Sequence, residues 1–123
     1  MTLAEHDSGV YRRALEALRN GVPNRDAVRV LGCGQVSAEA AFDGQLADVA
    51  NLVASGEQSA GLLVAGGFGT GKSHLLEYLQ HRALSENFVV SKVVVSKETP
   101  LYDQAKVFRA AVDTAVVPGL RGE

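Results

Sequence analysis

Residues 66–80 have the sequence GGFGTGKSHLLEYLQ, and this stretch decides which fold class the chain is expected to adopt. Its first eight residues, 66–73, match the pattern G-x-x-x-x-G-K-[ST] at every fixed position. The match lies between a short apolar run and an amphipathic helical pattern, the context in which it is most specific. Its glycines allow the backbone to wrap closely around several phosphate oxygens. The stretch therefore predicts a phosphate loop, residues 66–73, between a strand and a helix.

Each part of the predicted phosphate loop has an expected role. Backbone N–H groups of the loop and the positive end of the following helix would face the phosphates. Lys72 would bridge the β- and γ-phosphates, and the Ser73 hydroxyl would ligate Mg²⁺. His74 is interpreted either as a solvent-facing helix residue or as a catalytic base. The predicted binding residues in this stretch are Gly66, Gly67, Phe68, Gly69, Thr70, Gly71, Lys72, Ser73 and His74.

The spacing of apolar residues predicts the other elements. Helices are expected at 10–19, 24–31 and 37–53, then after the phosphate loop to about residue 86, and finally from about residue 100 to 115. Asn24, Ser37 and Thr99 are the expected N-caps. Residues 62–65 predict a parallel strand covered on both faces, and residues 88–96, with Lys92 in their middle, a strand near a sheet edge. This order of elements predicts an α/β fold with a parallel sheet.

The composition is that of one globular domain. The chain has 123 residues, of which 46% are hydrophobic and 21% charged, and its net charge of −2 gives no overall attraction to nucleic acid. Its single cysteine, Cys33, excludes an internal disulfide and is interpreted either as a reactive thiol or as a small residue filling a bend. We expect no signal peptide and no membrane span, and therefore a cytoplasmic protein.

Hydrolysis of a nucleoside triphosphate requires more than a phosphate loop. An acidic residue must hold the metal from its other side, and the attacking water must be oriented. In P-loop proteins this acid directly follows an apolar strand, whereas Glu98 comes three positions after Val95. Glu98 is therefore interpreted either as the metal-side acid or as a charged residue leading into the last helix. We expect the chain to hold a nucleotide and to lack the hydrolytic half, which leaves open whether it is an enzyme.

Three longer runs resemble a known family: LEALRNGVPNRDAVRVLG (15–32), GLLVAGGFGTGKSHLLEYLQHRAL (61–84) and NFVVSKVVVSKETPLYDQAKVFRAAV (87–112). They resemble the N-terminal part of the BREX-system ATP-binding domain family, P-loop ATPases of AAA+ type associated with bacterial phage defence. The resemblance covers residues 10–118 and implies ATP as the nucleotide, held by Gly66, Gly71, Lys72 and Ser73. It also implies that Val22, Pro23 and Arg25 lie near the adenine, although Arg25 is interpreted equally well as a solvated charge in the first turn of a helix.

The same resemblance implies a longer parent ATPase. Members of the family continue through a Walker B strand, a sensor strand and a C-terminal helical part. We therefore expect a truncated chain: an incomplete P-loop NTPase of AAA+ type, with N-terminal helices and only the first two parallel-type strands. The expected organisation is a disordered N-terminus at 1–9, a helical segment at 10–56 and a truncated ATP-binding domain at 57–123.

Three functions are weighed. The leading one is the ATP-binding part of a phage-defence ATPase that does not hydrolyse ATP alone. Its expected partners are ATP and either other defence-system proteins or further copies of itself, with DNA reached only through such a complex and no membrane contact. The alternatives are a small P-loop phosphotransferase that uses Glu98 or His74, and a DNA-binding adaptor in which residues 15–32 form a helix-turn-helix.

Overall fold

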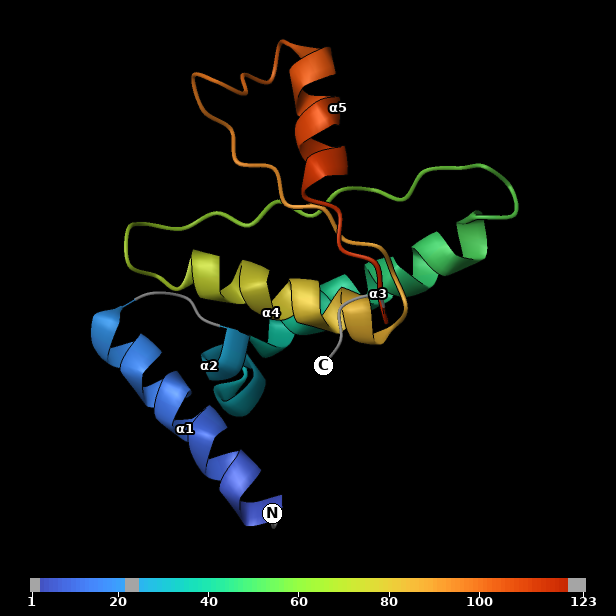
Figure 1. Ribbon diagram of the computed structural model, residues 1–123. Helices are drawn as coiled ribbons and strands as arrows, with labels where there is room; N and C mark the ends of the chain where they lie inside the picture. Colours follow the sequence, from blue (N-terminus) through green and yellow to red (C-terminus); the bar gives the residue numbers. More distant parts are fainter. Residues whose placement is uncertain (1–2, 22–24, 120–123) are drawn as a thin grey trace. The chain divides into compact units, whose positions relative to one another are not determined.

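The computed structural model describes residues 3–21 and 25–119, and these residues form helices joined by loops (Figure 1). The chain divides into two compact units, Met1–His81 and Arg82–Glu123. The first unit contains α1, α2, α3 and most of α4, and the second contains α5. The helices described are α1 (Leu3–Asn20), α2 (Arg25–Leu31), α3 (Val36–Leu52), α4 (Lys72–Ser85) and α5 (Gln104–Asp113).

In the first unit, α1 and α2 pack against each other through small side chains. Ala14 and Ala17 lie one helical turn apart on α1 and are buried with Ala27 of α2. Because alanine has only a methyl side chain, the two helix backbones can approach closely. At the rim of this contact, Arg13 Nε donates a hydrogen bond of 2.6 Å to Asp26 Oδ2. α1 ends before Gly21, as the sequence predicted. Asn24, the expected N-cap of the next helix, lies outside the described residues.

The apolar stripes predicted on α3 and α4 are buried to different degrees. On α4, the helical spacing predicted an inward stripe of four residues, of which Leu75, Leu79 and Ala83 are buried whereas Leu76 is 47% exposed. On α3, no described residue is buried, and Phe42 and Leu46 are only half-buried. They line a groove of about 530 Å³ whose other side is the loop at residues 57–62. The Gln45 side-chain amide donates a hydrogen bond to the carbonyl of Ala60 and so holds this loop against α3.

The prediction of an α/β fold with two parallel-type strands is wrong for this structure. The described residues contain no strand, and residues 62–65 form an irregular, extended segment in which Leu63 is 90% exposed. A strand is stabilised by hydrogen bonds to a neighbouring strand and by cover over its faces, and this segment has neither in the described chain. Apolar, glycine-bounded sequence was therefore not sufficient to make a strand at 62–65.

The second predicted strand, residues 88–96, is also absent from the described structure. Its one β-type contact is an isolated antiparallel bridge between Val90 and Val116, in which each N–H donates to the other's carbonyl at 3.0 and 2.8 Å. Val94 and Val95 remain 69% and 55% exposed. A single bridge pairs one residue of the segment and leaves the others without inter-strand hydrogen bonds. β-branched residues favour a strand only where they pack on a sheet, and this segment has no sheet to join.

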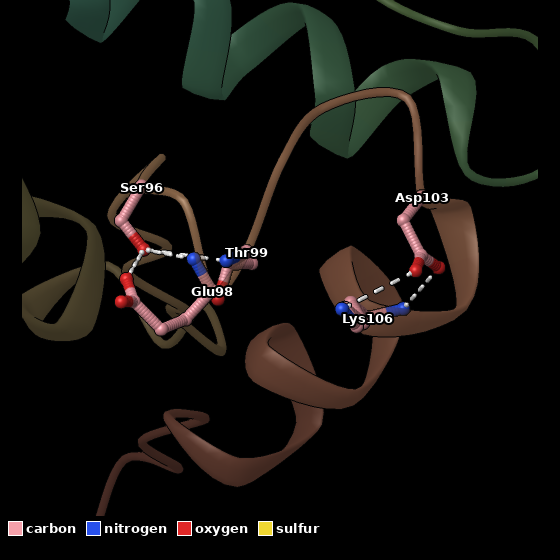
Figure 2. Close-up of polar contacts among 5 residues, drawn as sticks. All are labelled: Ser96, Glu98, Thr99, Asp103 and Lys106. Carbon is pink, nitrogen blue, oxygen red and sulfur yellow. Dashed lines mark hydrogen bonds and ion pairs between the residues drawn. The ribbon is translucent and has the colours of Figure 1, made fainter.

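Two of the expected helix starts also differ from the structure. α3 begins at Val36, before the expected cap Ser37, and its N-cap Gln35 makes no side-chain capping bond. α5 begins at Gln104, well after Thr99, because Asp103 is its N-cap and accepts a hydrogen bond from the Lys106 N–H at 3.1 Å (Figure 2). The carboxylate competes better than the earlier threonine because it reaches an otherwise unpaired N–H of the first turn.

Candidate nucleotide-binding site

The predicted phosphate loop lies in the first unit, between the extended segment at 61–65 and the first turn of α4. Its residues 66–71 are exposed, and the Phe68 side chain stands fully in solvent. The residues predicted to bind phosphate, 66–74, are thus brought together as one loop and one helix start. This placement follows from their adjacency in the sequence and does not require the predicted sheet.

The loop closes around the ammonium group of Lys72. Lys72 Nζ donates to the carbonyl oxygen of Gly66 at 2.8 Å and to that of Gly67, and it lies 3.4 Å from Thr70 Oγ1. Thr70 Oγ1 in turn donates to the Gly67 carbonyl at 2.9 Å. The positive charge is therefore held at the centre of the loop by its own backbone, where an anion bound to the loop would meet it.

Glycine is favoured at three positions of the loop, at Gly69 and Gly71 by a positive φ and at Gly66 by lack of space. Gly71 has φ of +85°, in the left-handed region that side chains disfavour. At Gly66 the reason is space, because a Cβ atom there would lie 2.8 Å from Thr70 Oγ1. The backbone conformation at Gly71 and the close approach at Gly66 fit the wrapping that a chain of phosphates needs.

The first turn of α4 supplies unpaired backbone donors beside the loop. The Leu75 N–H donates to the Gly71 carbonyl at 2.9 Å, which is the first hydrogen bond of the helix. The N–H groups of Lys72, Ser73 and His74 precede this bond and have no acceptor within the helix. Together with the helix dipole, these groups favour an anion at this end of α4. The Ser73 side chain is exposed beside them.

His74 has a contact that sequence reasoning missed. Its side chain is half-buried, and Nε2 lies 2.8 Å from the carbonyl oxygen of Gly32, 42 residues earlier in the chain. A carbonyl can only accept, so Nε2 must carry the proton and donate it. His74 is consequently not a solvent-facing residue, and this nitrogen is engaged in holding α4 to the end of α2. No local sequence signal predicts a bond over this separation.

A second contact missed by the sequence joins α3 to the same helix. Glu39 Oε2 accepts a hydrogen bond of 3.2 Å from the Tyr78 hydroxyl of α4, and Glu39 Oε1 accepts one of 2.9 Å from Cys33 Sγ. Tyr78 lies one turn after His74 and therefore on the same face of α4. We call these residues, with Gly32, the Glu39 network: Gly32, Cys33, Glu39, His74 and Tyr78.

The environment of Cys33 distinguishes between its two interpretations. The pKa of the thiol is raised, first by burial and then by the hydrogen bond to Glu39. Both effects disfavour the thiolate, which is the nucleophilic form. Cys33 is therefore a weakly reactive, half-buried thiol in the bend between α2 and α3, consistent with the interpretation as a small structural residue.

The other candidate site residues are Pro23, Arg25 and Glu98. Pro23 lies outside the described residues, and Arg25 begins α2 with a side chain that is likewise outside what is described. Glu98 lies in the second unit, where Ser96 Oγ donates to Glu98 Oε2 at 2.7 Å and accepts from the N–H groups of Glu98 and Thr99 (Figure 2). The hydrogen bond from Ser96 and that from its own N–H lower the pKa of this exposed carboxyl.

The turn at residues 96–99 gives Glu98 a structural role. Ser96 closes it with three hydrogen bonds, and Glu98 receives one of them. This agrees with the interpretation of Glu98 as a charged residue that leads toward the last helix. Within the described part of the chain, no group of three or more His, Cys, Asp or Glu side chains is arranged to hold a metal ion. No described helix combines the length and apolar character needed to cross a membrane.

Comparison with known proteins gives one family match. The model of a family described as BREX system ATP-binding protein BrxC/D matches residues 9–117, nearly the whole chain. This range includes the phosphate loop, α2 to α5 and most of α1. No curated protein and no solved structure gives a significant match.

Proposed function

The chain belongs to the family of BREX system ATP-binding proteins BrxC/D, and on this basis we propose that it binds ATP through residues 66–73. The observation that carries the proposal is the position of the Lys72 ammonium, bonded to the Gly66 carbonyl at 2.8 Å and enclosed by the loop. A polyphosphate-binding site requires a fixed cation, unpaired N–H groups at a helix start and a backbone without a side chain at the point of close approach, here Gly66. We assign residues 66–73 as a Walker A loop of the kind found in AAA+ ATPases.

Each group of the loop has a defined task in this proposal. Lys72 exchanges carbonyl partners for the β- and γ-phosphate oxygens, and the N–H groups at the start of α4 bind further oxygens. Ser73 supplies a hydroxyl to Mg²⁺, which otherwise takes phosphate oxygens and water as ligands. Phe68, Gly69 and Thr70 contribute backbone from the exposed side of the loop. The adenine is proposed to lie near Pro23 and Arg25, on the basis of the resemblance described above.

We propose further that this chain holds ATP without hydrolysing it alone. Hydrolysis needs an acid on the far side of the metal and an oriented water. The one candidate acid, Glu98, is engaged by Ser96 within its own turn. The Nε2 atom of His74 is likewise engaged, at the Gly32 carbonyl. The helical segment 10–56 and the ATP-binding segment 57–123 would then act with other defence-system proteins or further copies of the chain in the cytoplasm.

ATP binding is tested by titrating the purified chain with a fluorescent ATP analogue in the presence of Mg²⁺. Lys72→Ala removes charge-assisted hydrogen bonds and should weaken binding by about tenfold to hundredfold. Lys106→Ala is the matched control, because it removes the same charge from α5, where Lys106 pairs with Asp103 at 3.7 Å. Equal affinity of all three proteins would refute the assignment of the loop.

Two further measurements separate Mg²⁺ binding from hydrolysis. Ser73→Ala should reduce the gain in affinity that Mg²⁺ gives, while leaving Mg²⁺-free binding nearly unchanged. Phosphate release by the chain should not exceed that of Lys72→Ala. Release that depends on Lys72 would contradict the proposal that the hydrolytic acid is supplied from elsewhere.

A second candidate function is DNA binding by the pair α1 and α2. The observation that favours it is their packing through Ala14, Ala17 and Ala27 across the turn at Gly21, as in a helix-turn-helix. Against it, α2 has only the seven residues RDAVRVL, which include few groups that read bases. Duplex binding that weakens steeply with salt would support this function, and no binding at low salt would exclude it.

A further inference from the structure

We propose that Glu39 is a positioning residue for the nucleotide site, acting through Tyr78 to fix the first turns of α4. The inference rests on the proposed ATP binding at residues 66–73. It adds that the segment from Gly32 to Glu39, distant in sequence from the phosphate loop, takes part in setting the affinity of that loop.

The geometry places two side-chain tethers on one face of α4. His74 Nε2 donates to the Gly32 carbonyl at 2.8 Å, and one turn later the Tyr78 hydroxyl donates to Glu39 Oε2 at 3.2 Å. His74 directly follows Lys72 and Ser73, the residues assigned to phosphate and Mg²⁺. A rigid helix transmits a displacement along its axis, so holding these two positions fixes the direction in which the first N–H groups point.

Glu39 is itself held on its other oxygen. Cys33 Sγ donates to Glu39 Oε1 at 2.9 Å, so both carboxylate oxygens have partners from different segments. Glu39 lies in the first turn of α3, where its N–H donates to the Gln35 carbonyl at 2.9 Å. The Glu39 carboxylate, at the start of α3, thus connects the bend after α2 with the phosphate-binding helix α4.

This arrangement makes Cys33 a natural reporter of the nucleotide site. It is the only cysteine of the chain, so a thiol reagent labels this position alone. Binding that holds α4 more firmly against Glu39 should also hold the carboxylate that accepts the hydrogen bond from Cys33. If bound ATP stabilises the Glu39 network, ATP should slow the labelling of Cys33, and loss of the network should weaken ATP binding.

The experiment combines analogue titration with labelling by a chromogenic disulfide reagent on the full chain. Tyr78→Phe and Glu39→Ala should each weaken binding of the ATP analogue by about threefold to tenfold, the effect of one lost hydrogen bond. In the unmodified chain, saturating ATP should slow Cys33 labelling, and Lys72→Ala should abolish this effect. In Tyr78→Phe, ATP should still bind while its effect on labelling disappears.

Matched controls come from α1 in the same unit. Tyr11→Phe removes a hydroxyl from a half-exposed tyrosine, and Glu16→Ala removes an exposed carboxylate that pairs with Arg12 at 3.5 Å. Both should leave affinity and labelling unchanged. Circular dichroism identifies variants that have lost helix. The effect of ATP on Cys33 labelling is measured on the unmodified chain, so this test of the proposal does not depend on whether a variant folds.

The outcomes separate this inference from the proposed function. If the unmodified chain and Lys72→Ala bind the analogue equally, the proposed function fails. If Lys72→Ala loses binding but Tyr78→Phe and Glu39→Ala bind as tightly as the unmodified chain, the positioning role of Glu39 is overturned. Cys33 labelling that is indifferent to ATP in a chain that binds ATP also overturns it.

Discussion

Gly66→Ala should weaken ATP binding, and it should do so more than Gly67→Ala beside it. A Cβ atom at position 66 would lie 2.8 Å from Thr70 Oγ1, which is closer than such atoms approach in real structures. A Cβ atom at position 67 would have its nearest contact at 3.9 Å, to Thr70 Cγ2, an ordinary van der Waals distance. The two substitutions add the same methyl group one residue apart, so their difference isolates the close approach.

The size of the effect follows from the bonds that Thr70 makes. To admit the methyl group, Thr70 must move away from the Gly67 carbonyl, to which its hydroxyl donates at 2.9 Å, and from Lys72 Nζ at 3.4 Å. Loss of one such hydrogen bond costs about 0.5–1.5 kcal/mol. If the loop must regain its shape to bind phosphate, the Kd should rise by about twofold to tenfold.

The assay is titration of the purified proteins with the fluorescent ATP analogue at fixed Mg²⁺. Gly66→Ala, Thr70→Ala and the double variant form a cycle, because alanine at position 70 has no Oγ1 to meet the new methyl group. The penalty of Gly66→Ala should therefore shrink in the Thr70→Ala background. Equal binding by Gly66→Ala and Gly67→Ala, or a penalty that persists unchanged without Thr70, would refute the reasoning.

Three other outcomes are expected. Asp103→Ala removes the N-cap of α5, so the helix should lose about 1 kcal/mol of stability and circular dichroism should report less helix. Because burial and Glu39 raise the pKa of the Cys33 thiol, its labelling should require a higher pH than an exposed thiol, and Glu39→Ala should lower that pH. The stability that Cys33 contributes is then complete below the ordinary thiol pKa and is lost as pH rises through the raised value. Ala27→Leu should destabilise the α1–α2 contact by about 1–3 kcal/mol and lower Tm, whereas Ala47→Leu on the exposed side of α3 should not.

Each of these outcomes has a control that could contradict it. Asp113→Ala removes a carboxylate from the other end of α5, and an equal loss of helix from both variants would show that Asp103 is not the cap. A labelling profile that Glu39→Ala does not shift would mean that Glu39 is not the partner of Cys33. Equal Tm values for Ala27→Leu and Ala47→Leu would mean that the α1–α2 contact is not tightly packed.

The sequence predicted the five described helices because the signals for a helix are local, but it placed a disordered N-terminus at residues 1–9, whereas α1 begins at Leu3. The buried positions Leu75 and Leu79 follow from helical spacing, and the end of α1 follows from Asn20 and Gly21, which favour a helix C-terminus. The cap of α5 was misplaced at Thr99, because threonine and Asp103 are both acceptable caps and only the folded chain shows which side chain reaches an N–H. The capping preferences of individual residues limit where a helix can start but do not decide which of these positions is used.

By itself, the sequence determined that residues 66–71 form a loop leading into α4 at Lys72, because the glycine spacing and the helical pattern act over a few adjacent residues. Tertiary structure decided whether 62–65 and 88–96 become strands, since a strand exists only where another segment completes its hydrogen bonds. It likewise decided the tethers of α4, because His74 meets Gly32 and Tyr78 meets Glu39 across separations of 42 and 39 residues. Contacts of that range depend on how the helices pack, and no pattern of neighbouring residues encodes them.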